Sequence, residues 1–246
     1  MTGAEKRTAL ITGGAKGIGF ACAEALEASG YNVKVIGRDL EALKSCDFDY
    51  EVCDVTSESA VTEVFAKIGR VDILVNNAGI ASTAPVHRTT LSDWNNAFAV
   101  NATGAFLCTR AVLAGMRQRN WGRVITIAST ASQSGAPYIA AYAASKHAVL
   151  GLMRVVASEV EGSGVTANSV CPTFVRTEMT QQSVRKIVEL TGKTPLEAEQ
   201  TLANQSALNR LLEPQEVAAA VVYLSSDLAG AVNGQSIIID GGTTQQ

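Results

Sequence analysis

A tyrosine and a lysine four residues apart, Tyr142 and Lys146, are the side chains of this sequence best suited to proton transfer. They open a segment with helical periodicity, so both side chains lie on one face of the expected helix. A phenol with an ordinary pKa of about 10 is a poor base near neutrality, but a neighbouring ammonium favours the phenolate. We therefore predict that Lys146 lowers the pKa of Tyr142. The tyrosine can then protonate an alkoxide during carbonyl reduction, or accept the proton during alcohol oxidation.

A glycine-rich turn, residues 12–19, separates the first predicted strand from the first predicted helix. Glycines there permit a tight turn and the close approach of a pyrophosphate, whose charge faces the helix N-terminus. Such a turn alone is also compatible with a purely structural role. Two later segments favour a dinucleotide site. Asp54-Val55 follows the third strand, where a side chain can reach an adenine edge, and Asn76–Gly79 ends the fourth strand, at the edge where open parallel sheets bind ligands.

The end of the second predicted strand bears on which dinucleotide binds. Enzymes that select NAD generally place an acidic residue there for the ribose 2′-hydroxyl, whereas this sequence has Gly37 followed by Arg38. Arg38 and Lys16 are two cations that favour a 2′-phosphate. Asp39 comes one residue later and is expected to cap the next helix. We therefore predict NADP(H) in preference to NAD(H). NAD(H) stays as the alternative, because a one-residue shift of this loop reverses the argument.

Short β-branched runs alternate with longer amphipathic segments along the chain. This order predicts a single α/β domain over residues 1–246, a Rossmann-type doubly wound, mostly parallel seven-stranded sheet with helices on both faces. Residues 173–209 interrupt the rhythm as a helical insertion, which we expect to be a substrate-side lid; the alternative is a solvated helical pair without a role. The predicted strands are Thr8–Thr12, Asn32–Ile36, Phe48–Cys53, Val71–Val75, Arg123–Ala128, Val165–Val170 and Ser236–Ile239. The predicted helices are Phe20–Ser29, Ser57–Ile68, Leu91–Arg119, Tyr142–Glu161 and Pro214–Ser225.

Composition narrows the classes of function. The net charge is −3 and there is no run of Lys or Arg, so nucleic-acid binding is not expected. No signal peptide and no apolar stretch near the ~20 residues of a membrane span is apparent, so we predict a cytoplasmic protein without a membrane association. The five cysteines lack metal or redox spacing and are expected to be reduced and buried. Neither His87 nor His147 has a Cys, Asp or Glu at ligand spacing, so no metal site is predicted.

Taken in order along the chain, these motifs resemble those of the short-chain dehydrogenase/reductase family. The resemblance runs from about Arg7 to Gly242 and is closest to 3-oxoacyl reductases that act on carrier-protein or CoA thioesters. It implies a hydride transfer between a nicotinamide dinucleotide and a carbonyl/alcohol pair. The matching motifs are residues 12–19, Asp54-Val55, Asn76–Gly79, Asn101, Ser129, Tyr142 with Lys146, and residues 172–177.

The resemblance also implies catalytic roles. Ser129, thirteen residues before the tyrosine, would hydrogen-bond the substrate carbonyl; from the sequence alone, Thr130 and Ser132 are neighbouring alternatives. Asn101 would hold a water that links Lys146 to solvent as a proton relay. The alternative for Asn101 is a helix residue that bonds its own backbone. The predicted catalytic set is Asn101, Ser129, Tyr142 and Lys146.

The cofactor contacts implied by the resemblance extend to the sixth strand. Lys146 would also bind the nicotinamide ribose, and Thr177 the carboxamide. One departure is that Pro172 is followed by Thr173, where the family usually has Pro-Gly, and a Cβ there can narrow the nicotinamide edge of the pocket. The predicted cofactor-binding residues are Thr12, Gly13, Lys16, Gly17, Ile18, Gly19, Arg38, Asp54, Val55, Asn77, Ala78, Gly79, Tyr142, Lys146, Pro172, Val175 and Thr177.

The predicted function is an oxidoreductase that uses NADP(H) on a ketone or secondary alcohol, a 3-oxoacyl thioester or another apolar ketone. A hydroxysteroid or other secondary-alcohol dehydrogenase is the alternative within the class. From a different class, a dinucleotide-sensing protein without catalysis stays open, although the Ser129, Tyr142 and Lys146 set argues against it. The resemblance implies a homotetramer or a dimer, with contacts from the two long helices and the last strand.

Overall fold

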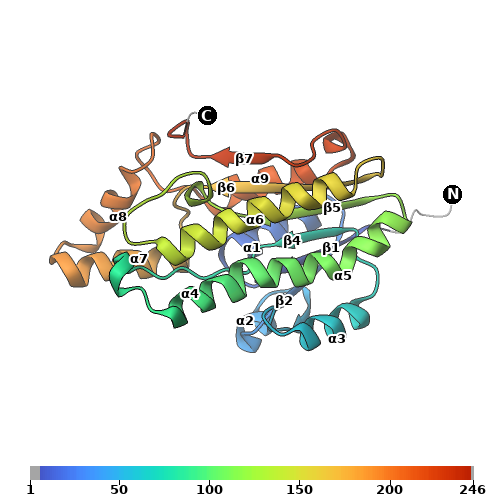
Figure 1. Ribbon diagram of the computed structural model, residues 1–246, viewed down its shortest axis with the longest axis horizontal. Helices are drawn as coiled ribbons and strands as arrows, with labels where there is room; N and C mark the ends of the chain where they lie inside the picture. The colour runs from blue at the N-terminus through green and yellow to red at the C-terminus, as the bar shows by residue number, and fades with distance from the viewer. Residues whose placement is uncertain (1–5, 245–246) are drawn as a thin grey trace.

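The parallel sheet at the centre of the molecule explains where the functional residues gather. A computed structural model of the chain describes residues 6–244, which contain seven strands in the order β3-β2-β1-β4-β5-β6-β7, all parallel (Figure 1). The order reverses between β1 and β4, so the carboxyl ends of these strands flank the crevice where such sheets bind ligands. The strands are β1 (Thr8–Thr12), β2 (Asn32–Gly37), β3 (Asp49–Val52), β4 (Ile73–Asn76), β5 (Gly122–Ile127), β6 (Val165–Pro172) and β7 (Ser236–Ile239).

Helices cover both faces of the sheet, and alternate residues of the central strands bury into one layer or the other. Ala9 and Ile11 of β1 pack with α1 and α9, whereas Leu10 between them packs with α3, α5 and α6. This two-sided burial accounts for the continuous apolar runs of the central strands. The helices are α1 (Gly17–Ala28), α2 (Leu40–Ser45), α3 (Glu58–Ile68), α4 (Leu91–Phe98), α5 (Gly104–Gln118), α6 (Ala140–Glu159), α7 (Glu178–Thr191), α8 (Pro195–Ala203) and α9 (Pro214–Ser225).

The predicted fold class is confirmed, and the predicted elements differ from the observed ones mainly at their ends. The strand predicted at Val71–Val75 is β4, which begins two residues later. Asp72 precedes it, where its carboxylate accepts the N–H of Thr8 at 3.0 Å and pairs with Arg70. The five cysteines are buried and free, as predicted.

The helix predicted at Leu91–Arg119 contains an irregularity that its hydrophobic pattern does not reveal. Residues Ala99–Thr103 form a π turn between α4 and α5, and Gly104 donates its N–H to the carbonyl of Ala99. The continuous helical segment Leu91–Gln118 is long and apolar enough to cross a membrane by length and composition, so the prediction that no such segment exists is wrong. Its buried side packs against α3, β4, β5 and α6, as a core helix does.

The insertion predicted at residues 173–209 carries α7 and α8, which project at one end of the molecule in Figure 1. The two helices share a small core of Val184, Ala198 and Leu202, so part of their apolar surface is ordinary packing. Leu190 and Leu196 stay exposed, at 76% and 78%. Across from α7, the ammonium of Lys186 donates to the carbonyl of Thr83 at 2.5 Å and to its hydroxyl at 2.6 Å. The insertion is therefore attached to the loop that follows β4.

Candidate active site

The glycine turn at the end of β1 is shaped by close backbone approaches. Gly13 and Gly17 have φ of +63° and +54°, where side chains other than glycine are strained. A Cβ on Gly19 would lie 2.3 Å from the carbonyl oxygen of Gly13, and one on Gly17 would lie 3.2 Å from Cγ2 of Thr177. The turn therefore requires glycine at these positions and passes directly beside the loop after β6.

The described turn fits the pyrophosphate of a dinucleotide. Lys16 is the N-cap residue of α1 and makes no side-chain hydrogen bond to the helix, so the first N–H groups of α1 are open to an anion. Gly13, Gly17 and Ile18 are only partly buried, which leaves the turn accessible. These residues would hold the phosphates, and the nicotinamide would then supply or accept a hydride.

The side chain of Thr12 ties the glycine turn to the end of β4. Its side chain is 2% exposed, and its hydroxyl accepts the N–H groups of Asn77 at 3.0 Å and Ala78 at 2.9 Å. The Asn77 amide also donates to the carbonyls of Thr12 and Gly13. Thr12 and Asn77 thus join the ends of β1 and β4 and position the turn.

The two cations predicted to bind a 2′-phosphate, Lys16 and Arg38, follow the carboxyl ends of β1 and β2, and each lies beside a carboxylate. Lys16 donates to Asp39 at 2.5 Å, and Arg38 lies 3.8 Å from Asp54. Asp39 also caps α2 by accepting the N–H of Ala42, which confirms that prediction. The bond from Lys16 holds the pKa of the Asp39 carboxyl below its usual value. Arg38 is 63% exposed and its contact is long, so it is the more available of the two cations.

Tyr142, Lys146 and Ser129 meet at the carboxyl ends of β5 and β6. The Lys146 ammonium lies 5.9 Å from the centre of the Tyr142 ring and donates to the carbonyl of Ile127 at 2.7 Å. Of the three neighbouring hydroxyls, Ser129 is the one whose hydrogen bonding lowers the pKa of the Tyr142 phenol, so Ser129, and not Thr130 or Ser132, faces the tyrosine. Ser132 instead positions Ser129: its hydroxyl accepts the Ser129 N–H at 2.9 Å and donates to the Ser129 carbonyl at 2.6 Å.

The direction of the tyrosine pKa differs from the prediction. Burial raises the pKa of Tyr142 above its ordinary value, and the hydrogen bond from Ser129 only partly opposes this shift. Burial also lowers the pKa of Lys146 to about 8, since the charged ammonium has lost its water. The prediction of a lowered tyrosine pKa is therefore wrong for the protein without its cofactor, because desolvation of the phenol is the largest effect on it. A protonated phenol beside a lysine of lowered pKa is arranged to donate a proton.

The side chain of Asn101 lies in the π turn and is 2% exposed. Its carbonyl oxygen accepts the N–H of Ile80 at 2.8 Å, and its amide donates to the Ile80 carbonyl at 3.0 Å and to the hydroxyl of Ser145 at 2.9 Å. The alternative that it bonds its own helix is wrong. Asn101 instead connects the loop after β4 to the helix that carries Tyr142 and Lys146.

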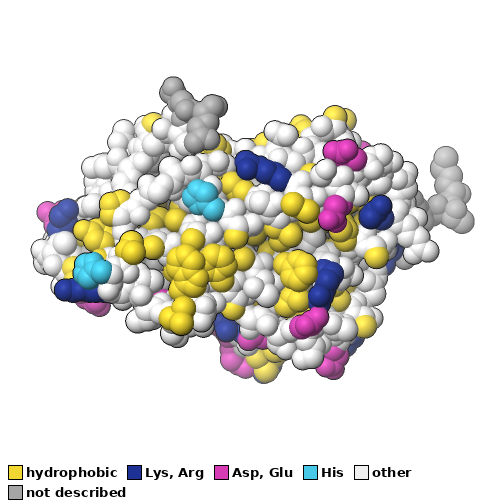
Figure 2. Space-filling view, in the orientation of Figure 1, with side chains coloured by type: hydrophobic (Ala, Val, Ile, Leu, Met, Phe, Trp, Pro, Cys, Tyr) yellow, Lys and Arg dark blue, Asp and Glu magenta, His cyan; other side chains and the backbone are white. Residues whose placement is uncertain are grey.

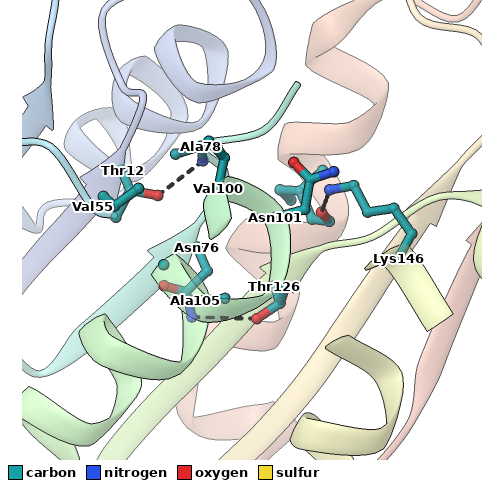
Figure 3. Close-up of a pocket in the computed structure, with 11 residues that line it drawn as sticks. Thr12, Val55, Asn76, Ala78, Val100, Asn101, Ala105, Thr126 and Lys146 are labelled. Carbon is teal, nitrogen blue, oxygen red and sulfur yellow. Dashed lines mark hydrogen bonds between the residues drawn. The ribbon is translucent and has the colours of Figure 1, made fainter. Parts of the chain in front are cut away.

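A small cavity lies between the ends of β1, β4 and β5, the π turn and Lys146 (Figure 3). Its volume of about 10 Å³ is near the lower limit for one water molecule. Asn76, Asn101 and Lys146 are among the residues that line it. The Oδ1 atom of Asn76 is buried without a hydrogen-bond partner among residues 6–244, so the wall of the cavity offers a free acceptor.

The loop after β6 completes the edge of the site. Pro172 is the last residue of β6, and Val175 is 4% exposed and belongs to the core beneath the turn. Thr177 caps α7 by accepting the N–H of Thr180 and lies beside Gly17 of the glycine turn. Thr173, which stands where the family usually has glycine, donates its N–H to the carbonyl of Ile239. The end of β7 therefore fixes the backbone at this position.

Two residues that lie at this site, Cys171 and Ser145, were not assigned to it from the sequence. Cys171 is fully buried beside Lys146 and Tyr142, and Gln133 donates to its sulfur at 3.9 Å. Burial raises the pKa of its thiol, so it stays protonated. In the sequence, Cys171 is one more apolar position before a proline. Ser145 is visible only as a small residue between Tyr142 and Lys146, and its contact to Asn101 depends on the folded chain.

Comparison with known proteins shows which family the chain belongs to. A family model described as enoyl-(acyl carrier protein) reductase matches residues 13–244. The chain is 37% identical to an acetoacetyl-CoA reductase of Shinella zoogloeoides, over 96% of this chain and 98% of that one. It is 35% identical to a D-beta-hydroxybutyrate dehydrogenase of Cupriavidus necator, covering 98% of both. A crystal structure of actinorhodin polyketide ketoreductase with NADPH aligns with a TM-score of 0.94, at 32% identity and over 98% of both chains. The chain belongs to the short-chain dehydrogenase/reductase family, and it is an oxidoreductase of that family.

Proposed function

We propose that this enzyme reduces a 3-oxoacyl thioester or a similar apolar ketone with NADPH, using Tyr142 as the general acid. The observation that carries the proposal is the meeting of Ser129, Tyr142 and Lys146 at the carboxyl ends of β5 and β6, beside Gly79, with a phenol whose pKa is raised. A protonated phenol suits reduction, where a proton must be given to the developing alkoxide. The similarity to an acetoacetyl-CoA reductase supports a CoA thioester as the substrate.

In this mechanism the chain orients the substrate and moves one proton. The hydroxyl of Ser129 holds the carbonyl oxygen, and the Tyr142 phenol gives its proton to that oxygen as the hydride arrives at carbon. Lys146 and a water in the cavity next to Asn101 return a proton to the phenolate. Gly13, Lys16, Gly17, Ile18, Gly19, Ala78 and Gly79 would hold the dinucleotide backbone, Asp54 and Val55 its adenine, and Thr177 its carboxamide.

The direct test is NADPH oxidation by the purified protein with acetoacetyl-CoA, and with a simple ketone of similar size for comparison. We expect turnover with the thioester and oxidation of a 3-hydroxyacyl-CoA in the reverse direction. Turnover of cyclic secondary alcohols alone would favour the hydroxysteroid-type alternative. Dinucleotide binding without turnover of any substrate would leave the sensing protein as the better interpretation.

We propose NADP(H) over NAD(H) because Arg38 is exposed at the end of β2 and carries only a long contact to Asp54. Arg38→Ala is expected to raise the KM for NADPH roughly tenfold, since a charge-assisted bond to a 2′-phosphate is lost, while the KM for NADH stays within about twofold. Lys44→Ala, an exposed lysine on α2 that pairs with Glu41, is the control and should change neither. Equal changes for both dinucleotides would contradict the assignment of Arg38.

We also propose that the enzyme is a cytoplasmic homotetramer, built on the face formed by α4, α5 and α6. Figure 2 shows hydrophobic side chains gathered on this face, and Trp94, Phe106 and Val155 are 38%, 43% and 55% exposed. Sedimentation should therefore detect a tetramer. Phe106→Glu is expected to yield smaller species, because a charge would be buried in the contact. Leu196→Glu, at an equally apolar but remote position on α8, should leave the assembly intact. The five free buried thiols fit a reducing compartment.

The insertion is proposed to act as a lid over the substrate. Its attachment through Lys186 to Thr83 spans from α7 to the loop after β4, and Met179 is 36% exposed at the start of α7. An exposed apolar side chain on this insertion favours an apolar acyl group as the part of the substrate that it covers.

A further inference from the structure

The buried hydroxyl of Ser145 has an arrangement that its own helix does not require. Ser145 lies between Tyr142 and Lys146 on α6 and is 0% exposed. Its hydroxyl donates to the carbonyl of Tyr142 at 2.8 Å and accepts the amide of Asn101 at 2.9 Å. The Asn101 group that contacts the hydroxyl is the side-chain NH2, which can only donate, so the hydroxyl proton must point at the Tyr142 carbonyl. The chain of bonds therefore has one direction, from amide to hydroxyl to carbonyl.

The far end of this chain is fixed as well. The Asn101 side chain is held by both the N–H and the carbonyl of Ile80, at 2.8 and 3.0 Å. Asn101 itself lies in the π turn Ala99–Thr103, a local irregularity of the kind that recurs at functional sites. The Ser145 hydroxyl thus accepts a hydrogen bond from a side chain that is held in place by a different element. Because the same hydroxyl donates to the Tyr142 carbonyl, it ties the first turns of α6 to the π turn.

We propose that Ser145 is a positioning residue of the reaction, which locks the first turns of α6 so that Tyr142 and Lys146 keep their separation. The proposal rests on the proposed function of Tyr142 and Lys146. Lys146 and the thiol of Cys171 are the titratable groups beside the phenol, from α6 and β6. Without the lock, the distance from the ammonium to the phenol is no longer fixed. The cation then stabilises the phenolate less, and the proton relay is misaligned.

Ser225 offers a matched control at the opposite edge of the sheet. It is also a helix serine with 0% exposure, and its hydroxyl donates to the carbonyl of Val221 at 2.8 Å. Its hydroxyl accepts no hydrogen bond from another side chain in residues 6–244, and its backbone carbonyl accepts the Tyr31 hydroxyl at 3.1 Å. Its neighbour Ser226 accepts from Arg123 near the start of β5, away from the site. Ser225→Ala therefore removes the same kind of buried bond without touching the proposed machinery.

The experiment compares Ser145→Ala with Ser225→Ala in the full chain. We expect kcat for ketone reduction to fall roughly tenfold or more in Ser145→Ala, since small misplacements of reacting groups have large effects, and to stay within about twofold in Ser225→Ala. The melting temperatures of the two variants should be similar. Ultraviolet titration of the phenol, with Tyr142→Phe as the reference, should place the Tyr142 transition at higher pH in Ser145→Ala than in the natural sequence.

A Ser145→Ala enzyme whose kcat and phenol titration match those of Ser225→Ala would overturn the proposal. If Ser145→Ala does not fold, Ser145→Cys makes the same comparison, because its thiol keeps the volume and only a weak hydrogen bond. If the natural sequence reduces no ketone, the proposed function fails, but the phenol titration still decides whether Ser145 controls Tyr142.

Discussion

Replacing Tyr142 by phenylalanine is expected to lower kcat for ketone reduction roughly a thousandfold, while NADPH still binds within about threefold of its original affinity. The phenol is partly buried, faces Ser129 and has a pKa raised by its burial, so it keeps its proton in the cofactor-free protein. Its removal deletes the proton donor and leaves the glycine turn unchanged. The measurement is NADPH absorbance during turnover, together with dinucleotide binding by fluorescence.

Tyr223→Phe is the matched control for this substitution. Tyr223 lies on α9, is 48% exposed and has no position at the site, so its activity should equal that of the natural sequence within about twofold. A Tyr142→Phe enzyme that keeps a tenth or more of its kcat would show that the proton comes from elsewhere. Because burial raises the Tyr142 pKa, the phenol stays protonated across neutral pH in the cofactor-free protein. Ultraviolet titration of that protein should therefore place its transition above the ordinary phenol value of about 10.

Much of the site could be predicted because it depends on positions that the sequence pattern fixes. The glycine turn, Asn76–Gly79 and Ser129 each follow a buried strand, and the carboxyl ends of parallel strands share one edge. Tyr142 and Lys146 share a face because helical geometry places residues four apart together.

What could not be predicted depends on which groups the fold brings near one another. The π turn leaves the hydrophobic pattern of Leu91–Gln118 intact, so periodicity does not reveal it. The carboxylate partners of Lys16 and Arg38 come from loops after other strands, and only the packed structure pairs them. The tyrosine pKa was predicted in the wrong direction for the same reason. The cation is visible in the sequence, whereas the loss of water around both groups is a property of the folded chain.

Lys146→Met is expected to abolish activity and, at neutral pH, to make the cofactor-free protein more stable. The Lys146 side chain is 5% exposed and its pKa falls from 10.5 to about 8, so folding disfavours its charged form. Below pH 8 that cost is fully present, at about 3 kcal/mol for a shift of this size. Loss of the bond to the Ile127 carbonyl offsets about 1–2 kcal/mol. We expect a net gain on the order of 1 kcal/mol in the free energy of unfolding.

The pH dependence makes this prediction specific. The unfolded lysine keeps its proton up to pH 10.5, whereas the folded lysine loses it near 8, so the unfolded state binds more protons between these values. The stability of the natural sequence must therefore rise with pH across this window, relative to Lys146→Met, and the advantage of the variant should disappear by about pH 10. Denaturant unfolding at about pH 7 and about pH 10 measures it, with Lys67→Met, an exposed lysine paired with Glu51, as the control. A Lys146→Met protein that is less stable by the same amount at both pH values would show that Lys146 is not a destabilising buried cation. The two roles are linked: the lysine that would serve the reaction by lying in a dry site is one that lowers the stability of the protein when the dinucleotide is absent.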